Sequence, residues 1–258
     1  MTFTLGPRAA KAGYRIREYE RLDSTNSEAL RLARSGESGP LWIVTREQTA
    51  GRGRRGREWM SAPGNLAASV LIREAIRPQA AATLGFAASL AACHACRELA
   101  RGIDFKVKWP NDVLANGRKV AGILLESESQ PGTLSIVTGF GINLAEAPSN
   151  TAFPAASLAG LGKAITPQTA LTTLTDVFSD LLILWRQDFA AIRRLWLDSA
   201  QGVGEAVAIR VGERTESGVF ETLDEQGRLM LRRTDNTLEA ISAGDVYFGS
   251  VASAGAMA

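Results

Sequence analysis

The pattern of apolar and turn residues changes at Gly202, and this change limits the possible folds more than any other feature of the sequence. After Gly202 the sequence consists of short alternating apolar runs separated by turn residues, which predict strands at 206–211, 218–223, 229–233 and 238–241. About 45 residues of this kind predict a small all-β unit. The longer patterns before Gly202 belong to a separate domain. The predicted division is residues 1–201, residues 202–250, and a frayed tail at residues 251–258.

The length of 258 residues agrees with one large and one small domain, at about 150 residues per domain on average. Apolar residues make up 45% of the chain and charged residues 22%, which is typical of a globular protein with a buried core. The 29 Lys and Arg nearly balance the 27 Asp and Glu, so the formal charge is only +2. The overall electrostatic field of the molecule therefore does not favour binding to nucleic acid or to an anionic membrane.

The patterns before Gly202 predict a mixed sheet with helices packed on it. Strands are expected at 14–19, 41–45, 65–72, 105–109, 113–115, 119–126 and 133–144, and helices at about 25–34, 79–101, 167–185 and 189–197. Asn116-Gly117 is a strong hairpin signal, and Thr25 with Glu28 spells a helix-starting capping box. Strands outnumber the helices that could connect parallel neighbours, so the predicted fold class is α+β.

Cysteine and histidine are too scarce for a structural zinc site or a catalytic triad. Cys93, His94 and Cys96 are the only residues of these types, whereas a structural zinc site needs four ligands. Two cysteines form no disulfide framework, which favours a reducing compartment. Residues 1–19 lack the pattern of a secretory signal, and no run is apolar enough to span a membrane. We expect a cytoplasmic protein without a membrane partner.

A basic glycine-rich loop is the first segment that could carry chemistry. Gly51-Arg52-Gly53-Arg54-Arg55-Gly56 has the letters of the dinucleotide fingerprint, but Ser61-Ala62-Pro63-Gly64 cannot continue into the helix that the fingerprint needs. Such a loop can fold over a polyanion, because glycine lets backbone N–H groups approach and arginine pairs with phosphate oxygens. A solvated basic loop and a nucleic-acid contact remain open on these residues alone. Gln48, just before the loop, is a candidate ligand contact.

A second cluster lies around the Asn116-Gly117 hairpin. Three of the five lysines, at 106, 108 and 119, fall within it, which suggests that compact ammonium groups are used there; for Lys106 an exposed strand face is favoured. Asp112 could bind a cation, act as a base or cap the turn, and the turn role is favoured. Gly139 and Gly141 suggest close approach of a ligand or another backbone, so Asn143 could offer an amide to that ligand, and a β-bulge is the alternative.

Together these segments resemble the biotin protein ligases. The matching motifs, in family order, are Asp23-Ser24-Thr25-Asn26, Glu47-Gln48 followed by residues 51–57 and Trp59, Lys108-Trp109-Pro110-Asn111-Asp112, residues 118–123, and Gly141-Ile142-Asn143-Leu144. The resemblance spans about residues 15–248. It implies a mixed-sheet catalytic domain of the class II synthetase-like, biotin–lipoate ligase fold, followed by a small SH3-like β-barrel.

The resemblance also implies a reaction in two halves. Biotin attacks the α-phosphate of ATP, with Mg²⁺ present, and gives biotinyl-5′-AMP and pyrophosphate. A lysine of the biotin carboxyl carrier protein of acetyl-CoA carboxylase then takes the biotinyl group. The first nucleophile is already an anion, so no strong base is needed, and a site without His or Cys suits this chemistry.

By resemblance, three groups of residues form the site. The biotin-binding residues are Ser24, Thr25, Asn26, Gln48, Arg52, Gly53, Arg54, Lys119 and Gly122. The residues that bind ATP or the adenylate are Arg52, Arg54, Arg55, Arg57, Trp59, Lys108, Trp109, Asn111 and Asn143. The catalytic residues are Lys119, which bridges the biotin carboxyl group and the α-phosphate, Arg54, in a loop that closes over the adenylate, and Asp112, which orients or deprotonates the acceptor lysine or helps to hold Mg²⁺.

Some family members carry an N-terminal helix-turn-helix domain and repress biotin genes. The 22 residues before Asp23 cannot hold such a domain, so we expect the enzyme-only class without DNA binding; a homodimer stays open. A lipoate–protein ligase is the nearest alternative, but two segments favour biotin. They are the basic loop at residues 51–57, called the Gly-Arg loop below, and the Lys108–Asp112 segment. A non-catalytic biotin sensor or an RNA-binding module is a further alternative; the near-neutral charge and the lack of interleaved aromatic residues disfavour RNA.

Overall fold

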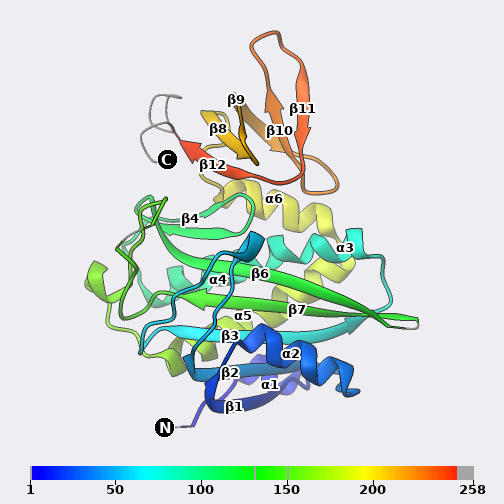
Figure 1. Cartoon of the computed structure of the whole chain (residues 1–258), viewed down its shortest axis with the longest axis vertical. Coiled ribbons are helices and arrows are strands. Elements are labelled where there is room, and N and C mark those ends of the chain that lie inside the picture. The colour runs from blue at the N-terminus through cyan, green and yellow to red at the C-terminus, as the bar shows by residue number, and fades with distance from the viewer. Residues whose placement is uncertain (1, 131, 150, 249–258) are drawn as a thin grey trace.

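The computed structural model describes residues 2–130, 132–149 and 151–248, and it contains a large and a small β-sheet (Figure 1). Within these residues the large sheet has the order β1-β2-β3-β7-β6-β5-β4. Its strands are β1 (Arg15–Leu22), β2 (Leu41–Gln48), β3 (Leu66–Glu74), β4 (Phe105–Lys108), β5 (Asp112–Ala115), β6 (Arg118–Gln130) and β7 (Thr133–Ile142). β1 and β2 are parallel and the other neighbours are antiparallel. The predicted mixed sheet is therefore confirmed.

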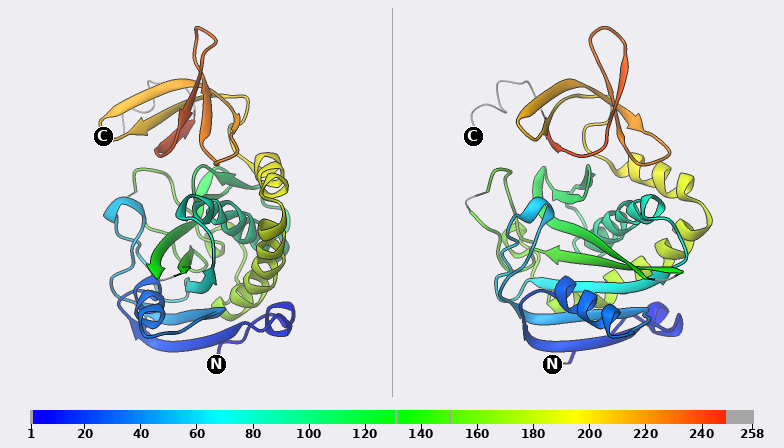
Figure 2. Two further views of the ribbon diagram at one scale, coloured as in Figure 1. Left: turned by 90° about the vertical axis from the view of Figure 1, so that its right-hand side faces the viewer. Right: turned by 45° about the vertical axis from the view of Figure 1, so that its right-hand side comes forward.

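Helices cover both faces of the large sheet (Figure 2). They are α1 (Pro7–Lys11), α2 (Thr25–Arg34), α3 (Pro78–Ala82), α4 (Leu84–Leu99), α5 (Pro167–Gln187) and α6 (Phe189–Ser199), with short 3₁₀ turns η1 (Arg54–Gly56) and η2 (Ala159–Leu161). Side chains alternate along β2, as they must in a strand. Leu41 and Ile43 pack on α2, whereas Trp42 and Val44 belong to the larger core beneath α4 and α5. β2 is thus buried on both faces. In the described part of the chain, no helix is long and apolar enough to cross a membrane.

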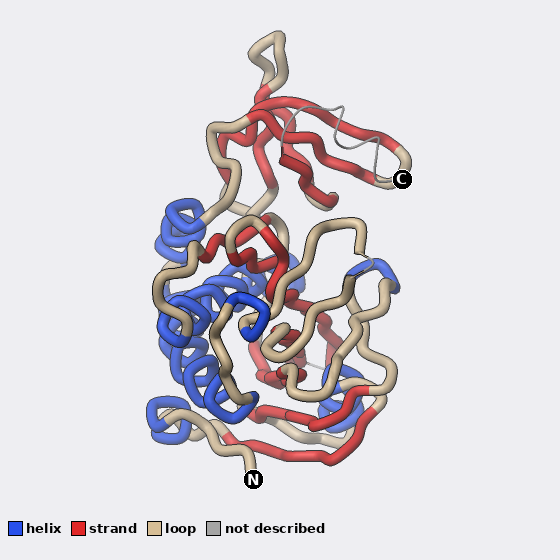
Figure 3. The backbone as a smooth tube through the Cα atoms, turned by 90° about the vertical axis from the view of Figure 1, so that its left-hand side faces the viewer, coloured by secondary structure: helices blue, strands red, loops and turns tan. Residues whose placement is uncertain are grey.

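The small sheet lies at one end of the molecule, beyond α6 (Figure 3). Its strands are β8 (Ala206–Val211), β9 (Arg214–Leu223), β10 (Leu229–Arg232), β11 (Leu238–Ile241) and β12 (Asp245–Phe248), in the antiparallel order β11-β10-β9-β8-β12. This confirms the predicted small β domain. Among the described residues β11 and β12 are not paired, so the sheet is open rather than a closed barrel. The predicted tail at 251–258 lies outside the described residues.

Some predicted boundaries were wrong because tertiary contacts decide them. Ser24, not Thr25, caps α2, and its side-chain oxygen accepts the Ser27 N–H at 3.4 Å. Thr25 is the first helical residue. Its N–H donates to Gln48 and its hydroxyl contacts Ser69, so its side chain does not cap the helix. Glu28 closes no capping box; it accepts the Tyr19 hydroxyl at 2.9 Å and pairs with Arg31.

The predicted helix at 79–101 is two helices, α3 and α4, which break at Thr83. The Thr83 hydroxyl donates to Ala80 O and accepts the Trp185 indole N–H at 2.8 Å, an interaction with α5 that local sequence does not reveal. The hairpin at Asn116-Gly117 is confirmed, because both residues have positive φ, 48° and 74°, as a type I′ turn requires. The short elements α1 and β12 were not predicted.

Candidate active site

A pocket opens beside β6 and β7, between the start of α2 and the Gly-Arg loop. Thirteen of the predicted site residues line it: Ser24, Thr25, Asn26, Gln48, Arg52, Gly53, Arg54, Arg57, Trp59, Asn111, Asp112, Lys119 and Gly122. The four others, Arg55, Lys108, Trp109 and Asn143, do not line it. The pocket is also lined by residues to which the sequence analysis assigned no site role, although Ile123 and Gly141 stand in its motifs: Glu58, Ile123, Leu124, Gly139, Phe140, Gly141 and Asp245. Segments far apart in the sequence thus meet at one cavity.

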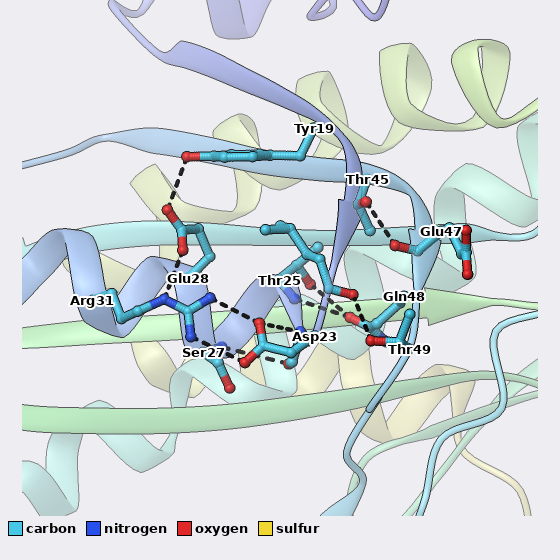
Figure 4. A network of polar contacts seen from close by, with 12 residues as sticks. Tyr19, Asp23, Thr25, Ser27, Glu28, Arg31, Thr45, Glu47, Gln48 and Thr49 are labelled. Atoms are coloured by element: carbon cyan, nitrogen blue, oxygen red, sulfur yellow. Dashed lines mark hydrogen bonds and ion pairs between the residues drawn. The ribbon is translucent and has the colours of Figure 1, made fainter.

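The floor of the pocket is a neutral hydrogen-bonding surface at the start of α2. The Gln48 side-chain oxygen accepts the Thr25 N–H at 3.0 Å and lies 3.3 Å from the Thr25 hydroxyl (Figure 4). Ser69, on β3, donates to Asn26 Oδ1 at 2.6 Å and lies 2.7 Å from Thr25 Oγ1. Ser24, Thr25 and Asn26 are buried, with relative exposures of 3–4%. Their donors and acceptors are therefore held in place before any ligand enters.

A charged pair beneath this floor fixes the entry into α2 (Figure 4). The Asp23 carboxylate accepts the Ser24 N–H at 2.7 Å and two hydrogen bonds from Arg31, at 3.0 and 2.8 Å. The hydrogen bonds from Arg31 hold the pKa of Asp23 at about 2, so this carboxylate is ionised at neutral pH. The first residues of α2 are thus anchored on their outer side.

Glycines of β6 and β7 make room for two side chains of the pocket. A Cβ on Gly141 would lie 2.2 Å from the Trp59 ring, and a Cβ on Gly139 would lie 2.2 Å from Asn26 Oδ1. β7 pairs with β3 and β6 in continuous register, so the β-bulge considered for this segment is absent. The glycines instead allow close approach of the Trp59 indole and the Asn26 amide.

One wall of the pocket places the positive charges of Lys119 and Arg54 near the Asp112 carboxylate, with Lys108 behind it. Lys119 Nζ lies 2.6 Å from Asp112 Oδ1 and 5.4 Å from the centre of the Trp59 ring. Lys108 Nζ lies 3.8 Å from Asp112 Oδ2, and burial lowers the pKa of Lys108. Two ammonium groups thus face a single carboxylate, and Arg54 adds a further positive charge nearby. Such a wall suits anionic ligands.

The Gly-Arg loop is held down at three points. Arg52 pairs with Glu126 of β6 at 2.9 Å, and Arg54 Nη1 donates to Asn111 Oδ1 at 3.2 Å. Arg57 pairs with Asp245 of the small β domain. Burial lowers the pKa of Arg54, whose side chain is half-buried, whereas Arg55 is exposed with φ of 57°. The arginines of one loop therefore take different positions, and only some reach the pocket.

The small β domain contributes directly to the pocket through Asp245. Burial, the largest influence, opposes ionisation of this carboxyl group, but the hydrogen bond from Arg57 and the positive charges of Arg57, Lys108 and Arg55 together leave the pKa of Asp245 below its ordinary value. The two domains also meet where the buried Trp109 indole donates to Gly227 O at 3.2 Å. Trp109 thus joins the domains, a role that its predicted place near the adenylate did not include.

Asn143 braces the segment beside Lys119 instead of lining the pocket. Its Nδ2 donates to Ala156 O at 3.3 Å. The Lys119 backbone is bonded on both sides to the same segment, to Pro154 O at 2.8 Å and to Ala156 N at 2.9 Å. Asn143 therefore helps to place the Lys119 backbone.

The carboxylates do not fit a resident metal ion. Asp112 faces Lys119 and Lys108, and Asp245 faces Arg57. In residues 2–130, 132–149 and 151–248, no group of three or more His, Cys, Asp or Glu side chains could hold a metal. Mg²⁺ is usually held by one or two carboxylates together with substrate phosphates. A dedicated Mg²⁺ site formed by these residues alone is therefore not supported.

Comparisons with known proteins agree with the geometry. The biotin/lipoate A/B protein ligase family matches residues 18–143, and the biotin protein ligase C-terminal domain matches residues 202–249. A biotin–[acetyl-CoA-carboxylase] ligase from Paracoccus denitrificans is 43% identical over 245 residues, which cover 89% of this chain and 98% of the relative. One from Mycobacterium tuberculosis is 34% identical, over 86% and 85%. A biotin protein ligase from Aquifex aeolicus in complex with biotin and ATP superposes with a TM-score of 0.75 at 27% identity, over 90% and 97%.

Proposed function

The chain belongs to the biotin protein ligase family, and we infer from this premise that it is an acyl-adenylate-forming ligase with biotin and ATP as substrates. It forms biotinyl-5′-AMP and transfers biotin to a lysine of the biotin carboxyl carrier protein of acetyl-CoA carboxylase. One observation carries this conclusion: a neutral polar floor and a cationic wall meet in one pocket, and the residues of the family motifs form both.

The two surfaces match the two ends of biotin. The ureido ring is neutral and has both donors and acceptors, which the Thr25, Asn26 and Gln48 groups of the floor can satisfy. The carboxylate end and the α-phosphate of ATP repel each other, and a nearby ammonium lowers that repulsion. We place Lys119 between these two anions, because its Nζ lies at the pocket beside Trp59. Ser24, Gly53 and Gly122 complete the proposed biotin site.

The Gly-Arg loop is the proposed lid over the adenylate. Arg52, Arg54 and Arg57 line the pocket with Trp59 and Asn111, so they can approach phosphate oxygens. A closed lid would keep water from the mixed anhydride. Contacts of Arg55, Lys108, Trp109 and Asn143 with ATP stay predictions, and the contacts of Trp109 and Asn143 support positioning roles for these two. We propose that Mg²⁺ enters with ATP, as a counter-ion of its phosphates.

Transfer to the carrier tests this function as a whole. Purified protein with biotin, Mg²⁺, ATP and a biotin carrier domain of acetyl-CoA carboxylase should add one biotinyl group to the carrier, as seen by intact mass. A carrier with arginine in place of the acceptor lysine is the control and should stay unlabelled. Labelling with lipoate in place of biotin would contradict the biotin assignment.

Asp112→Asn separates two roles of this carboxylate. We expect adenylate formation to slow about tenfold, because Lys119 loses a charged partner at 2.6 Å, and transfer from preformed adenylate to slow by about 10²-fold, because general-base assistance is lost. Rapid-quench measurement of each half-reaction gives both numbers. If transfer proceeds at the wild-type rate, Asp112 neither orients nor deprotonates the acceptor lysine, and its role is confined to adenylate formation through Lys119.

Gly141→Ala tests the packing of Trp59. The added Cβ would lie 2.2 Å from a rigid indole ring, so Trp59 must move, and we expect the KM for biotin to rise about tenfold, as a loss of about 1.4 kcal/mol would cause. Gly85→Ala is a matched control, since its Cβ would meet no atom within 4 Å. Equal KM values for the two variants would show that Trp59 does not shape the pocket.

Several expectations lie beyond the geometry and stay proposals. Cys93 and Cys96 are both buried and unpaired, which supports the proposed cytoplasmic location. We keep the predicted domain boundary between residues 201 and 202 and the predicted absence of DNA binding. A homodimer stays open.

A further inference from the structure

A carboxylate outside the predicted motifs connects the biotin floor to the lid. Glu126 lies on β6, and its Oε2 accepts the Asn26 side-chain N–H at 2.8 Å. Both Glu126 oxygens also accept from Arg52 Nη2, at 3.0 and 2.9 Å. One side chain thus binds a buried residue of the floor and an arginine of the lid at the same time.

The contact continues through the floor. Asn26 accepts from Ser69, which touches the Thr25 hydroxyl, which in turn lies beside the Gln48 side-chain oxygen. The hydrogen bonds therefore run without a gap from Gln48, where the loop begins, to Arg52 within it. Such connected networks respond as a unit when one member is changed.

Strand geometry explains why position 126 can do this. Side chains alternate along a strand, so Gly122, Leu124 and Glu126 share one face of β6. Gly122 and Leu124 line the pocket, and Glu126 lies just beyond it. The absent side chain of Gly139 on β7 lets the Asn26 amide reach this face.

We propose that Glu126 is a positioning residue that fastens the lid, through Arg52, to the Asn26 end of the biotin floor. The inference rests on the proposed function. Asn26 is held in place before a ligand enters, so Glu126 fastens the lid to a fixed point of the floor, and the lid retains the adenylate for as long as Glu126 holds Arg52. Glu126 itself touches neither reacting group; it acts through two residues that do line the pocket.

Glu126→Gln tests this, because it keeps the shape and removes the charge that strengthens the bond to Arg52. The same strand provides a matched control, Glu128→Gln. Glu128 pairs with Arg34 at 2.9 Å, as Glu126 pairs with Arg52, and the two carboxylates have side-chain exposures of 32% and 31%. Of these two ion pairs, the one between Glu126 and Arg52 joins the lid to the floor, and the one between Glu128 and Arg34 does not.

Two measurements read the effect. After a single turnover without carrier, we expect biotinyl-AMP to dissociate from E126Q about tenfold faster than from wild type or E128Q, as charge-assisted bonds of this kind suggest. In biotin-dependent ATP–pyrophosphate exchange, the KM for biotin should rise more than kcat falls. A merely structural role would lower the melting temperatures of E126Q and E128Q alike and would leave adenylate retention unchanged.

A second variant set tests the route through Arg52. If Glu126 acts through this arginine, E126Q added to Arg52→Ala should increase adenylate escape by less than twofold over R52A alone. Equal retention by E126Q and E128Q, or fully additive effects with R52A, would overturn the proposal. Failure of the wild type to catalyse biotin-dependent exchange would instead overturn the proposed function, so the two failures are distinguishable.

Discussion

Replacing Lys119 by alanine should lower biotin-dependent adenylate formation by about 10²- to 10³-fold, the scale of removing one preorganised charge from a reacting anion. Lys119 lines the pocket and is half-buried, and its Nζ lies 2.6 Å from Asp112 Oδ1. Without Lys119, no ammonium group offsets the repulsion between the biotin carboxylate and the α-phosphate. The Asp112 carboxylate, left without this partner, adds a further negative charge. The KM for biotin should also rise, because in the proposed function the same ammonium binds the biotin carboxylate in the ground state.

ATP–pyrophosphate exchange over a range of biotin concentrations measures both changes. Lys106→Ala is the matched control, since Lys106 lies on β4 of the same hairpin cluster but does not line the pocket. It should retain exchange within about twofold, as surface substitutions away from a site usually do. Wild-type exchange by K119A would remove Lys119 from between the two anions and would contradict the proposed chemistry of the wall.

Replacing Arg54 by alanine should release the adenylate at least tenfold faster and label bystander amines. Arg54 is the arginine of the loop whose guanidinium is drawn furthest from solvent: burial lowers its pKa, and it donates to Asn111 Oδ1 at 3.2 Å. Its loss removes a lid contact to Asn111, just before β5, and one of the positive charges proposed to face the phosphates, so we also expect adenylate formation to slow. A charge-assisted bond of about 1.5–3 kcal/mol accounts for this size of effect.

Arg55→Ala separates this contact from the general charge of the loop. Arg55 is the next residue, but it is exposed and does not line the pocket. Mass spectrometry of an added bystander protein, with biotin and ATP present, reads adenylate escape for both variants. Equal leakage from R54A and R55A would mean that loop charge, rather than the Arg54 position, retains the intermediate.

The elements that sequence predicted well are those fixed by local chemistry. The type I′ turn at Asn116-Gly117 follows from residues that tolerate positive φ, and the strand predicted at 41–45 follows from a short apolar run, as expected for a strand buried on both faces. The paired glycines of β7 left close approach of a ligand or another backbone and a β-bulge open, whereas the structure shows that side chains approach them. What approaches is a tryptophan from a distant loop, and no local pattern contains that information.

The features that sequence missed depend on contacts between distant segments. The break at Thr83 depends on Trp185, 102 residues away in the chain. Asp245 joins the pocket only because the small β domain places β12 beside the lid. Glu126 had no motif of its own, and its position on the pocket face of β6 could have been suggested only by counting alternate residues from Gly122. Trp109 was assigned to the adenylate from its motif, whereas its indole bonds Gly227 of the other domain.

The most direct test of the proposed function is ATP–pyrophosphate exchange by the purified protein with Mg²⁺, measured separately with biotin and with lipoate. We expect exchange with biotin, little or none with lipoate, and loss of the exchange with biotin in K119A. Exchange with lipoate alone would make the chain a lipoate ligase of the same fold. No exchange with either acid would contradict the central claim that this pocket activates biotin.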